Sequence, residues 1–396
     1  MTCGTFFGTI RSGFITMELQ RIQTLIAKYL DGNTTPEESR EVENWYAMIQ
    51  EESPLSAFND ANREQEYERL ISRILVPKKP KLLRIYWYVG WAAAVIILLS
   101  VMIWPVINKK NGGSGLQNVE LAGVAEASRE HIVFTFGNGH RINIDQQKNG
   151  ILQPENGLRL NVDSGRLAIE KLNLTEKLVW HSLTTPFRRK YIVDLPDGSR
   201  IWLNASSSVR FPNNFGNAKQ RILDLTGEAY FEVSHQENAG RAKPFIVRVA
   251  GEEINVLGTH FNVNAYGDRF KVVTTLFEGS VSVKEGATHL VLLPGEAAVT
   301  SKGGVLQRDV KVNLDAAQGW RRSVFIFERS DLREILDQFS HWYGLAIVYK
   351  TTPSGTVFSG KIPMDLDIQQ ALQIVEQPEI QFRVDSGKIY VEARKK

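Results

Sequence analysis

The chain has 396 residues, of which 47 are basic and 44 acidic, so its formal net charge is +3 at neutral pH. This near balance does not favour direct binding to nucleic acid, which needs clustered positive charge. Hydrophobic residues make up 43% of the chain, enough for packed cores, and such a length predicts about two to four domains. The single cysteine, Cys3, excludes an intrachain disulfide and a cysteine-based zinc site.

Residues 1–16 lack the long apolar region and the small-residue cleavage site of a secretory signal. Met17, followed by Glu-Leu-Gln, is the better candidate for the first residue of the protein. We therefore interpret residues 1–16 as a non-native N-terminal extension without a function of its own.

Residues 17–76 have the apolar spacing of short helices. The spacing predicts one helix over 19–30 and another over 64–75. Between them, Thr35-Pro36 followed by two glutamates is typical of a capped helix start. This segment has 12 acidic and 6 basic residues, and it is expected to form a small all-α bundle. Its charge suits a basic protein partner, although on charge alone an ordinary solvated helix surface is the favoured explanation.

Residues 85–107 are apolar or uncharged throughout, with Trp and Tyr near both ends. A stretch of this length can cross a bilayer core of about 30 Å, whereas buried helices of soluble proteins are usually shorter. Five Lys and Arg residues precede it closely and only Lys109 and Lys110 follow it. This bias predicts a single-pass protein of the inner (cytoplasmic) membrane, with its N-terminus in the cytoplasm and its C-terminus in the periplasm.

Residues 108–128 contain a Gly-Gly-Ser-Gly run and are predicted to be a linker. From 129 to 312 the pattern alternates as in strands. Asn138-Gly139 and Asp197-Gly198 are flanked by apolar runs, which predicts two hairpins. Further strands are predicted at residues 221–225, 229–234, 245–249, 253–256, 260–265, 271–276 and 280–284. Residues 129–312 are therefore expected to form an all-β sandwich or a domain of stacked hairpins.

Residues 320–393 predict a compact α+β domain with two βαβ-like halves. Helices are expected over 331–341 and 366–374, each with an Asp or Ser at its start. The predicted strands cover 324–327, 345–349, 357–361, 380–384 and 388–391. Such a domain exposes sheet edges that a protein partner can extend by strand addition.

Several motifs in this order resemble the FecR-type anti-sigma factors, in particular their Bacteroidetes branch, which carries an extra C-terminal domain. The motifs are KYLDGNTTPEESREVENWY (28–46), LPDGSRIWLNASSSVRFP (195–212), LTGEAYFEV (225–233), KPFIV (243–247), VLGTHFNVNAY (256–266) and LFEGSVSV (276–283). The family usually has Thr-Pro-Arg-Gly-Gly where this chain has Thr185-Pro186-Phe187-Arg188-Arg189. Losing both glycines removes easy access to positive φ, so the local turn is expected to differ.

The resemblance implies a signal relay. The headpiece (17–76) would bind an extracytoplasmic-function sigma factor in the cytoplasm. The part of the chain in the periplasm would contact the signalling domain of a TonB-dependent outer-membrane receptor, with residues 320–393 as the receptor-contact domain. Intramembrane and periplasmic proteases would then act on the chain. As contacts for the sigma factor we consider Leu25, Tyr29, Leu30 and Trp45, although a role as a core residue of the bundle is favoured for Trp45.

The resemblance also marks Gly258-Thr259, because some family members cut themselves at this bond. The Thr259 hydroxyl would attack the carbonyl carbon of Gly258 to give an ester that water then hydrolyses. A strained turn at this point would add to the driving force. The alternative is an ordinary glycine bulge between two strands.

No other pattern indicates chemistry. The seven histidines form no close-spaced metal pair, and no cofactor motif is present. Glu228, Glu232 and Glu278 could act as a glycosidase carboxylate pair, but acids near strand ends are usually solvated. We therefore expect no metal, no cofactor and no enzyme activity beyond a single self-cleavage. The alternative function is a membrane-anchored periplasmic β-protein that binds or hydrolyses carbohydrate.

Overall fold

The computed structural model describes residues 21, 24, 25, 28, 29, 34–51 and 130–394, apart from 153–157, 164, 172–177, 216–218, 239–240, 267–270, 302–303 and 354. Within this part of the chain no helix has the length and apolar character needed to cross a membrane. The predicted span at 85–107, the linker 108–128 and the predicted helix at 64–75 all lie outside the described residues.

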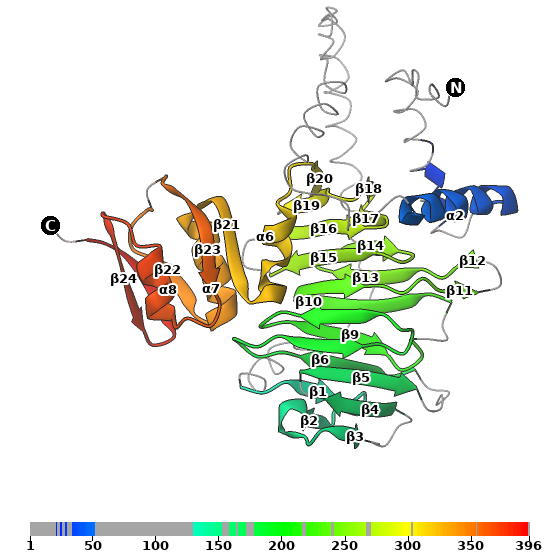
Figure 1. Ribbon diagram of the computed structural model, residues 1–396, viewed down its shortest axis with the longest axis horizontal. Helices are drawn as coiled ribbons and strands as arrows, with labels where there is room; N and C mark the ends of the chain where they lie inside the picture. The colour runs from blue at the N-terminus through cyan, green and yellow to red at the C-terminus, as the bar shows by residue number, and fades with distance from the viewer. Residues whose placement is uncertain are drawn as a thin grey trace, which may run out of the picture. The chain divides into compact units, whose positions relative to one another are not determined.

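Residues 133–309 form two β-sheets that share one strand (Figure 1). The first sheet has the order β2-β1-β6-β9-β10-β13-β14-β17-β18, and the second has the order β3-β4-β5-β7-β8-β10-β15-β16-β19-β20. The strands are β1 (Val133–Thr135), β2 (Arg141–Asn143), β3 (Gly150–Leu152), β4 (Leu158–Asp163), β5 (Arg166–Lys171), β6 (Trp180–Thr184), β7 (Tyr191–Asp194), β8 (Arg200–Leu203), β9 (Ser208–Pro212), β10 (Arg221–Glu232), β13 (Phe245–Val249), β14 (Glu252–Val256), β15 (His260–Ala265), β16 (Val272–Glu278), β17 (Val281–Glu285), β18 (Thr288–Leu292), β19 (Ala297–Ser301) and β20 (Val305–Asp309). A separate short hairpin joins β11 (Glu237–Asn238) and β12 (Arg241–Ala242).

The shared strand β10 differs from the prediction of two strands at 221–225 and 229–234. Its first half pairs with β9 and β13 in the first sheet, and its second half pairs with β8 and β15 in the second. Gly227 lies at the change of partner with φ +85°, a conformation that glycine adopts without the Cβ penalty. A Cβ built on Gly227 would lie 2.4 Å from Ser207 Oγ. One continuous strand therefore passes from sheet to sheet through a glycine bend.

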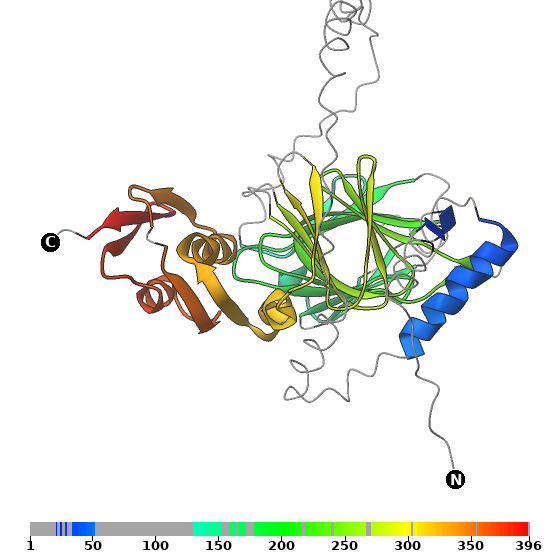
Figure 2. The same ribbon diagram turned by 90° about the horizontal axis from the view of Figure 1, so that it is seen from above.

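The two sheets face each other across one apolar core, and seen from above their strands surround it (Figure 2). Because side chains alternate along a strand, Ala229 and Phe231 of β10 point into this core, while Glu228 and Tyr230 point to the opposite face. The predicted sandwich is confirmed, and so are both predicted hairpins. Gly139 and Gly198 have φ values of +86° and +82°, as such turns require.

The C-terminal domain matches its predicted elements closely. Its described elements are α6 (Leu314–Gln318), the 3₁₀ helix η3 (Gly319–Arg322), β21 (Val324–Asp331), α7 (Leu332–Tyr343), β22 (Ala346–Tyr349), β23 (Val357–Pro363), α8 (Ile368–Ile374), β24 (Ile380–Asp385) and β25 (Lys388–Ala393). Asp331 caps α7 by accepting from the Glu334 amide at 2.8 Å, and Asp367 caps α8 in a capping box with Gln370. The strands form two separate sheets, β21-β23 and β22-β25-β24, so α7 and α8 each connect strands of different sheets, and the predicted βαβ-like halves are wrong. The helical turns α6 and η3 were not predicted.

The helix start predicted at Thr35-Pro36 is confirmed. The helix α2 spans Pro36–Glu51, and Thr35 and Glu38 cap it reciprocally with bonds of 3.2 and 2.9 Å. The bond from the Thr35 amide is the main cause that lowers the pKa of the Glu38 carboxyl. The described residues 21, 24, 25, 28 and 29 are helical, in line with the predicted helix at 19–30.

The structure also brings the headpiece into contact with the β-domain. Leu25, Tyr29 and Val42 share an apolar cluster with residues of the sandwich and its β11-β12 hairpin. The Tyr29 hydroxyl accepts a hydrogen bond of 2.8 Å from the Ala242 amide. The predicted membrane topology puts these two parts on opposite sides of a bilayer, so contact and topology exclude each other within one inserted chain.

Candidate functional site at the junction of two domains

The outer face of the second sheet is where the β-domain meets the C-terminal domain. In each strand the residues that alternate with core residues point to this face, and they are Trp202, Asn204, Glu228, Tyr230, Asn262 and Phe277. Tyr230 and Phe277 belong to one apolar cluster with Trp320 and Phe325 of the C-terminal domain. A face that would otherwise be solvated is therefore buried by the second domain.

Arg321 of η3 closes one side of this junction. Its guanidinium carbon lies 3.7 Å from the ring centre of Tyr230 and 4.4 Å from that of Trp202. The same guanidinium is 3.4 Å from Glu232 Oε1. The two aromatic rings and the carboxylate all favour a cation at this position, so Arg321 holds η3 on the outer face of the sheet.

Glu228 lies in the middle of the junction, and the expectation that it is solvated was wrong. It is only 7% exposed, because the C-terminal domain covers the strand face from which it projects. Asn204 Nδ2 donates to Oε2 at 2.8 Å and Asn262 Nδ2 donates to Oε1 at 2.9 Å. Burial raises the pKa of Glu228 to about 7, against the opposing effect of these amide donors.

The network continues into the C-terminal domain. Trp320 Nε1 donates to Asn262 Oδ1 at 3.3 Å. Beside Glu228 is a cavity of about 60 Å³, to which α7 contributes Gln338 and His341. The Tyr266 ring stacks on the His341 ring with 4.0 Å between centres, and the Tyr266 hydroxyl donates to the Ala205 carbonyl at 2.6 Å. Burial holds the pKa of Tyr266 well above its usual value.

The loop that departs from the family pattern forms a second contact between the domains. Arg188 has φ +57° although it is not glycine, and its amide donates to the Trp342 carbonyl at 2.8 Å. Phe187 packs on Gly344, the left-handed residue that ends α7, so closely that a Cβ there would lie 2.4 Å from the Phe187 ring. The positive φ expected of a glycine is thus adopted by an arginine, and the loop is held by its contacts with α7.

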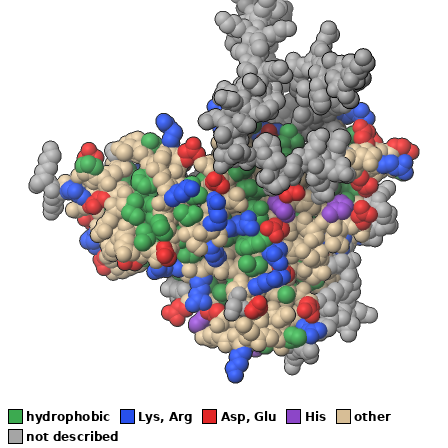
Figure 3. Space-filling model, viewed as in Figure 1, with side chains coloured by type: hydrophobic (Ala, Val, Ile, Leu, Met, Phe, Trp, Pro, Cys, Tyr) green, Lys and Arg blue, Asp and Glu red, His purple; other side chains and the backbone are tan. Residues whose placement is uncertain are grey.

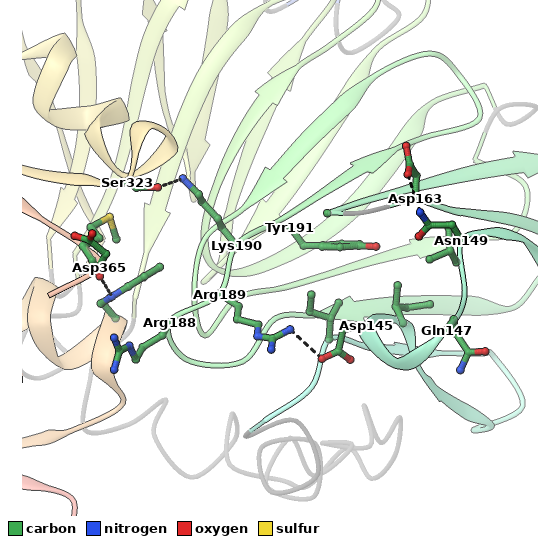
Figure 4. A pocket seen from close by; sticks show the side chains of 16 residues that line it. Asp145, Gln147, Asn149, Asp163, Arg188, Arg189, Lys190, Tyr191, Ser323 and Asp365 are labelled. Atoms are coloured by element: carbon green, nitrogen blue, oxygen red, sulfur yellow. Dashed lines mark hydrogen bonds and ion pairs between the residues drawn. The ribbon is translucent and has the colours of Figure 1, made fainter. Parts of the chain in front are cut away.

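A groove of about 750 Å³ lies beside this loop (Figure 4). Lys190 spans it, with Nζ donating to the Trp320 and Arg321 carbonyls and to Ser323 Oγ at 3.1, 2.7 and 2.7 Å. Burial, with a smaller contribution from Arg321, lowers the pKa of Lys190. Arg189 pairs with Asp145 at 3.0 Å on the opposite wall. In the space-filling view, Lys and Arg side chains gather in the same region between the two domains (Figure 3).

The predicted cleavage bond Gly258-Thr259 lies in the short connection between β14 and β15. Thr259 is 2% exposed and its hydroxyl donates to the Ser280 carbonyl at 3.1 Å. Gly258 is not among the residues with positive φ, so a left-handed strained turn is absent there. A Cβ at Gly258 would lie 3.1–3.2 Å from atoms of His235, a tight contact that a larger residue could make only if His235 shifted slightly. Gly279, with φ +87°, approaches so closely that its Cβ would be 2.8 Å from the Gly258 carbonyl oxygen.

The remaining candidates are not assembled into a site. Leu25 and Tyr29 are 6% and 7% exposed against the β-domain, while Leu30 and the Trp45 side chain lie outside what is described. Glu232 pairs with Arg321 and Glu278 pairs with His260 at 3.1 Å, so these acids have partners of their own. In the described part of the chain, no three His, Cys, Asp or Glu residues are placed to hold a metal ion.

Sequence reasoning missed the junction itself. Asn204, Asn262 and Trp320 carry no motif of a site, and alternation alone assigns the first two to a solvated face. The one available signal was the row of Trp, Asn, Glu and Tyr at the outward-pointing positions of strands whose apolar residues alternate regularly. An outer face with large aromatic residues indicates that another element covers it.

The chain is similar to known family models and to solved structures. Residues 182–282 match the family model described as FecR protein, and residues 324–391 match the one described as FecR, C-terminal. Two crystal structures of a candidate anti-sigma factor from Parabacteroides distasonis are similar. The first is 24% identical with a TM-score of 0.48, and the match covers 54% of this chain and 99% of the other. The second is 23% identical with a TM-score of 0.48, and the match covers 55% of this chain and 100% of the other. No curated protein matches the chain.

Proposed function

We propose, from the premise that this chain is a FecR-type protein, that it is an anti-sigma factor and transmembrane signal transducer. The observation that carries the proposal is the pair of family matches at 182–282 and 324–391 on one chain. The expected resemblance is confirmed by these matches. A role as a non-enzymatic regulator agrees with them too.

In this proposal the acidic headpiece 17–76 binds an extracytoplasmic-function sigma factor, and residues 85–107 anchor the chain as a single pass in the inner membrane. The β-domain and the C-terminal domain lie in the periplasm and respond to the signalling domain of a TonB-dependent receptor. Leu25, Tyr29, Leu30 and Trp45 are the proposed sigma contacts. Cleavage at Gly258-Thr259, and proteolysis by periplasmic and intramembrane proteases, belong to the same relay.

The deciding experiment is co-purification of the full chain, in detergent, with a sigma factor encoded near its gene. We expect a complex that is lost when residues 17–76 are replaced by an unrelated soluble domain. The replaced chain must still insert with its C-terminus in the periplasm, as reporter fusions at both ends can verify. An intact complex after replacement, or no complex with the native headpiece, would contradict the proposal.

The alternative of a carbohydrate-active protein receives no support from the carboxylates. Glu228 is covered by the C-terminal domain and bonded to two amides, and neither cavity described above contains Glu232 or Glu278. A glycosidase pair needs two carboxylates open to one substrate.

A further inference from the structure

Glu228 is a buried acid with no basic partner in the part of the chain that the structure describes. Its carboxylate accepts hydrogen bonds from the side-chain amides of Asn204 and Asn262, and the Asn264 side chain adds a smaller interaction of the same kind. The titratable groups that share its cavity are Tyr266 from the β-domain and His341 from α7, and none of the described residues that line this cavity is Lys or Arg. An ionised carboxylate in such surroundings is unfavourable unless it is paired, because it has lost water without gaining a positive charge.

This burial depends on the docking of the C-terminal domain. Glu228 projects from the outer face of the sheet, opposite to the core residues Ala229 and Phe231. Trp320, Phe325, Gln338 and His341 of the C-terminal domain cover it. If that domain leaves the sheet, Glu228 becomes exposed to water, where a glutamate ionises with an ordinary pKa.

The covering domain is joined to the β-domain by one short covalent segment and by the non-covalent contacts of the junction. Between β20 and α6 the chain has only the short segment 310–313, with Val310 exposed at the surface. The junction includes long polar contacts such as the 3.4 Å ion pair of Arg321 with Glu232, beside its apolar cluster. The Arg188 amide is bonded directly across the junction to the Trp342 carbonyl.

We propose that docking of the C-terminal domain on the second sheet is linked to proton binding at Glu228, so that the junction tightens in mild acid and loosens as the pH rises. The docked state holds the carboxyl neutral and the undocked state lets it ionise. Docking therefore takes up a proton. This inference rests on the contacts of the junction and does not depend on the sigma factor or the receptor.

The direction of the pH effect follows from the linkage between proton binding and docking. Burial raises the pKa of Glu228 in the docked state to about 7. A group with a raised pKa contributes stability that is fully present below its exposed pKa and is lost as pH rises through the docked one. With an exposed pKa of about 4.3, opening of the junction should increase about tenfold between about pH 6 and about pH 8.

The test uses the full chain in detergent micelles and hydrogen exchange read at the Arg188 amide, which is bonded across the junction. Exchange rates are corrected for their intrinsic pH dependence. In the wild type we expect about tenfold more opening at the higher pH. In Glu228→Gln, which imitates the neutral acid, opening should be low at both pH values. The matched control is Glu232→Gln, from the same strand and junction, which should keep the wild-type pH response.

Three results of this experiment would contradict the proposal. Equal opening at the two pH values in the wild type would overturn the proposal, and that measurement needs no variant to fold. A pH response that persists in folded Glu228→Gln would show that a group other than Glu228 binds the proton that is linked to docking. Opening that increases in acid would also overturn it, because a base that must stay neutral on docking gives that opposite sign.

Discussion

Arg221 and Asp197 form an ion pair of 2.8 Å whose side chains are 0% and 2% exposed. Arg221 starts β10, and Asp197 lies in the β7-β8 turn, so the pair ties a hairpin of one sheet to a strand of the other. Arg221 Nη1 also donates to the Ser234 carbonyl at 2.7 Å, and Nη2 donates to the Lys243 carbonyl at 2.6 Å. A buried charge with this many partners is costly to leave unpaired.

Replacing Asp197→Asn should therefore lower the free energy of unfolding by about 3–5 kcal/mol, because Arg221 remains buried without a counter-charge. Urea unfolding monitored by circular dichroism measures this loss. Glu253→Gln is the matched control, since its pair with Arg248 is 40–47% exposed and should cost less than about 1 kcal/mol. Equal effects of the two substitutions would refute the assigned role of the buried pair.

Gly227→Ala should destabilise the sandwich far more than Gly139→Ala. Both glycines have nearly the same φ, +85° and +86°. Only Gly227 is crowded, with Ser207 Oγ 2.4 Å from a built Cβ, whereas nothing lies within 4 Å at Gly139. We expect a loss of about 1 kcal/mol at Gly139 and about 3 kcal/mol or more at Gly227 in thermal unfolding. Similar losses would show that φ alone determines the cost.

His181 is a buried base among aromatic rings. It is 1% exposed, and its ring centre lies within 6.1 Å of those of Phe134, Phe136 and Phe211. Neither ring nitrogen has a hydrogen-bond partner among the described residues. Burial lowers its pKa to about 4. Because the unfolded chain binds the proton more readily, stability is complete above about pH 6.5 and is lost as pH falls through the folded value.

His181→Phe should remove this acid sensitivity and raise the free energy of unfolding at neutral pH by about 1 kcal/mol or more, since two unsatisfied polar atoms are deleted. Unfolding curves at about pH 7 and about pH 5 measure both effects. His289→Phe, at an exposed position of β18, is the comparison that should not change the pH slope. An unaltered slope in His181→Phe would assign the acid sensitivity to another group.

Thr259→Ala should abolish self-cleavage at Gly258-Thr259, so that full-length chain persists in immunoblots against the C-terminus. Thr259→Ser keeps the hydroxyl that donates to the Ser280 carbonyl and should still be cut. Identical band patterns for wild type and Thr259→Ala would end this proposal. Cleavage lost in both variants would indicate that the threonine methyl group, and not the nucleophile, is what matters.

The contact of Tyr29 with Ala242 offers a test of the predicted topology. If residues 17–76 and the β-domain lie on opposite sides of a membrane, Tyr29→Phe cannot alter the β-domain of the inserted chain. Proteolysis of the β-domain in right-side-out vesicles should then be identical for variant and wild type. Faster proteolysis in Tyr29→Phe would mean that the 2.8 Å bond forms in the inserted protein and that the topology is wrong.

The local elements were predictable to different degrees for physical reasons. The hairpins at Gly139 and Gly198, and the helix starts at Asp331 and Asp367, depend on a few neighbouring residues whose backbone preferences act over one turn. The continuity of β10 was not predictable, because Gly227 reads as a break in the sequence. In the structure it is a bend that Ser207, twenty positions earlier in the chain, approaches too closely for any residue with a Cβ.

Local preference and the alternation of apolar residues were enough to predict the hairpins, the capped helices and most of the strands. The burial of Glu228, Asn204 and Asn262 together beneath Trp320 became visible only in the folded chain. Alternation tells which face of a strand turns away from its own core. What covers that face depends on contacts between residues far apart in the chain, such as Asn262 and Trp320 at 58 positions, and no local pattern encodes them.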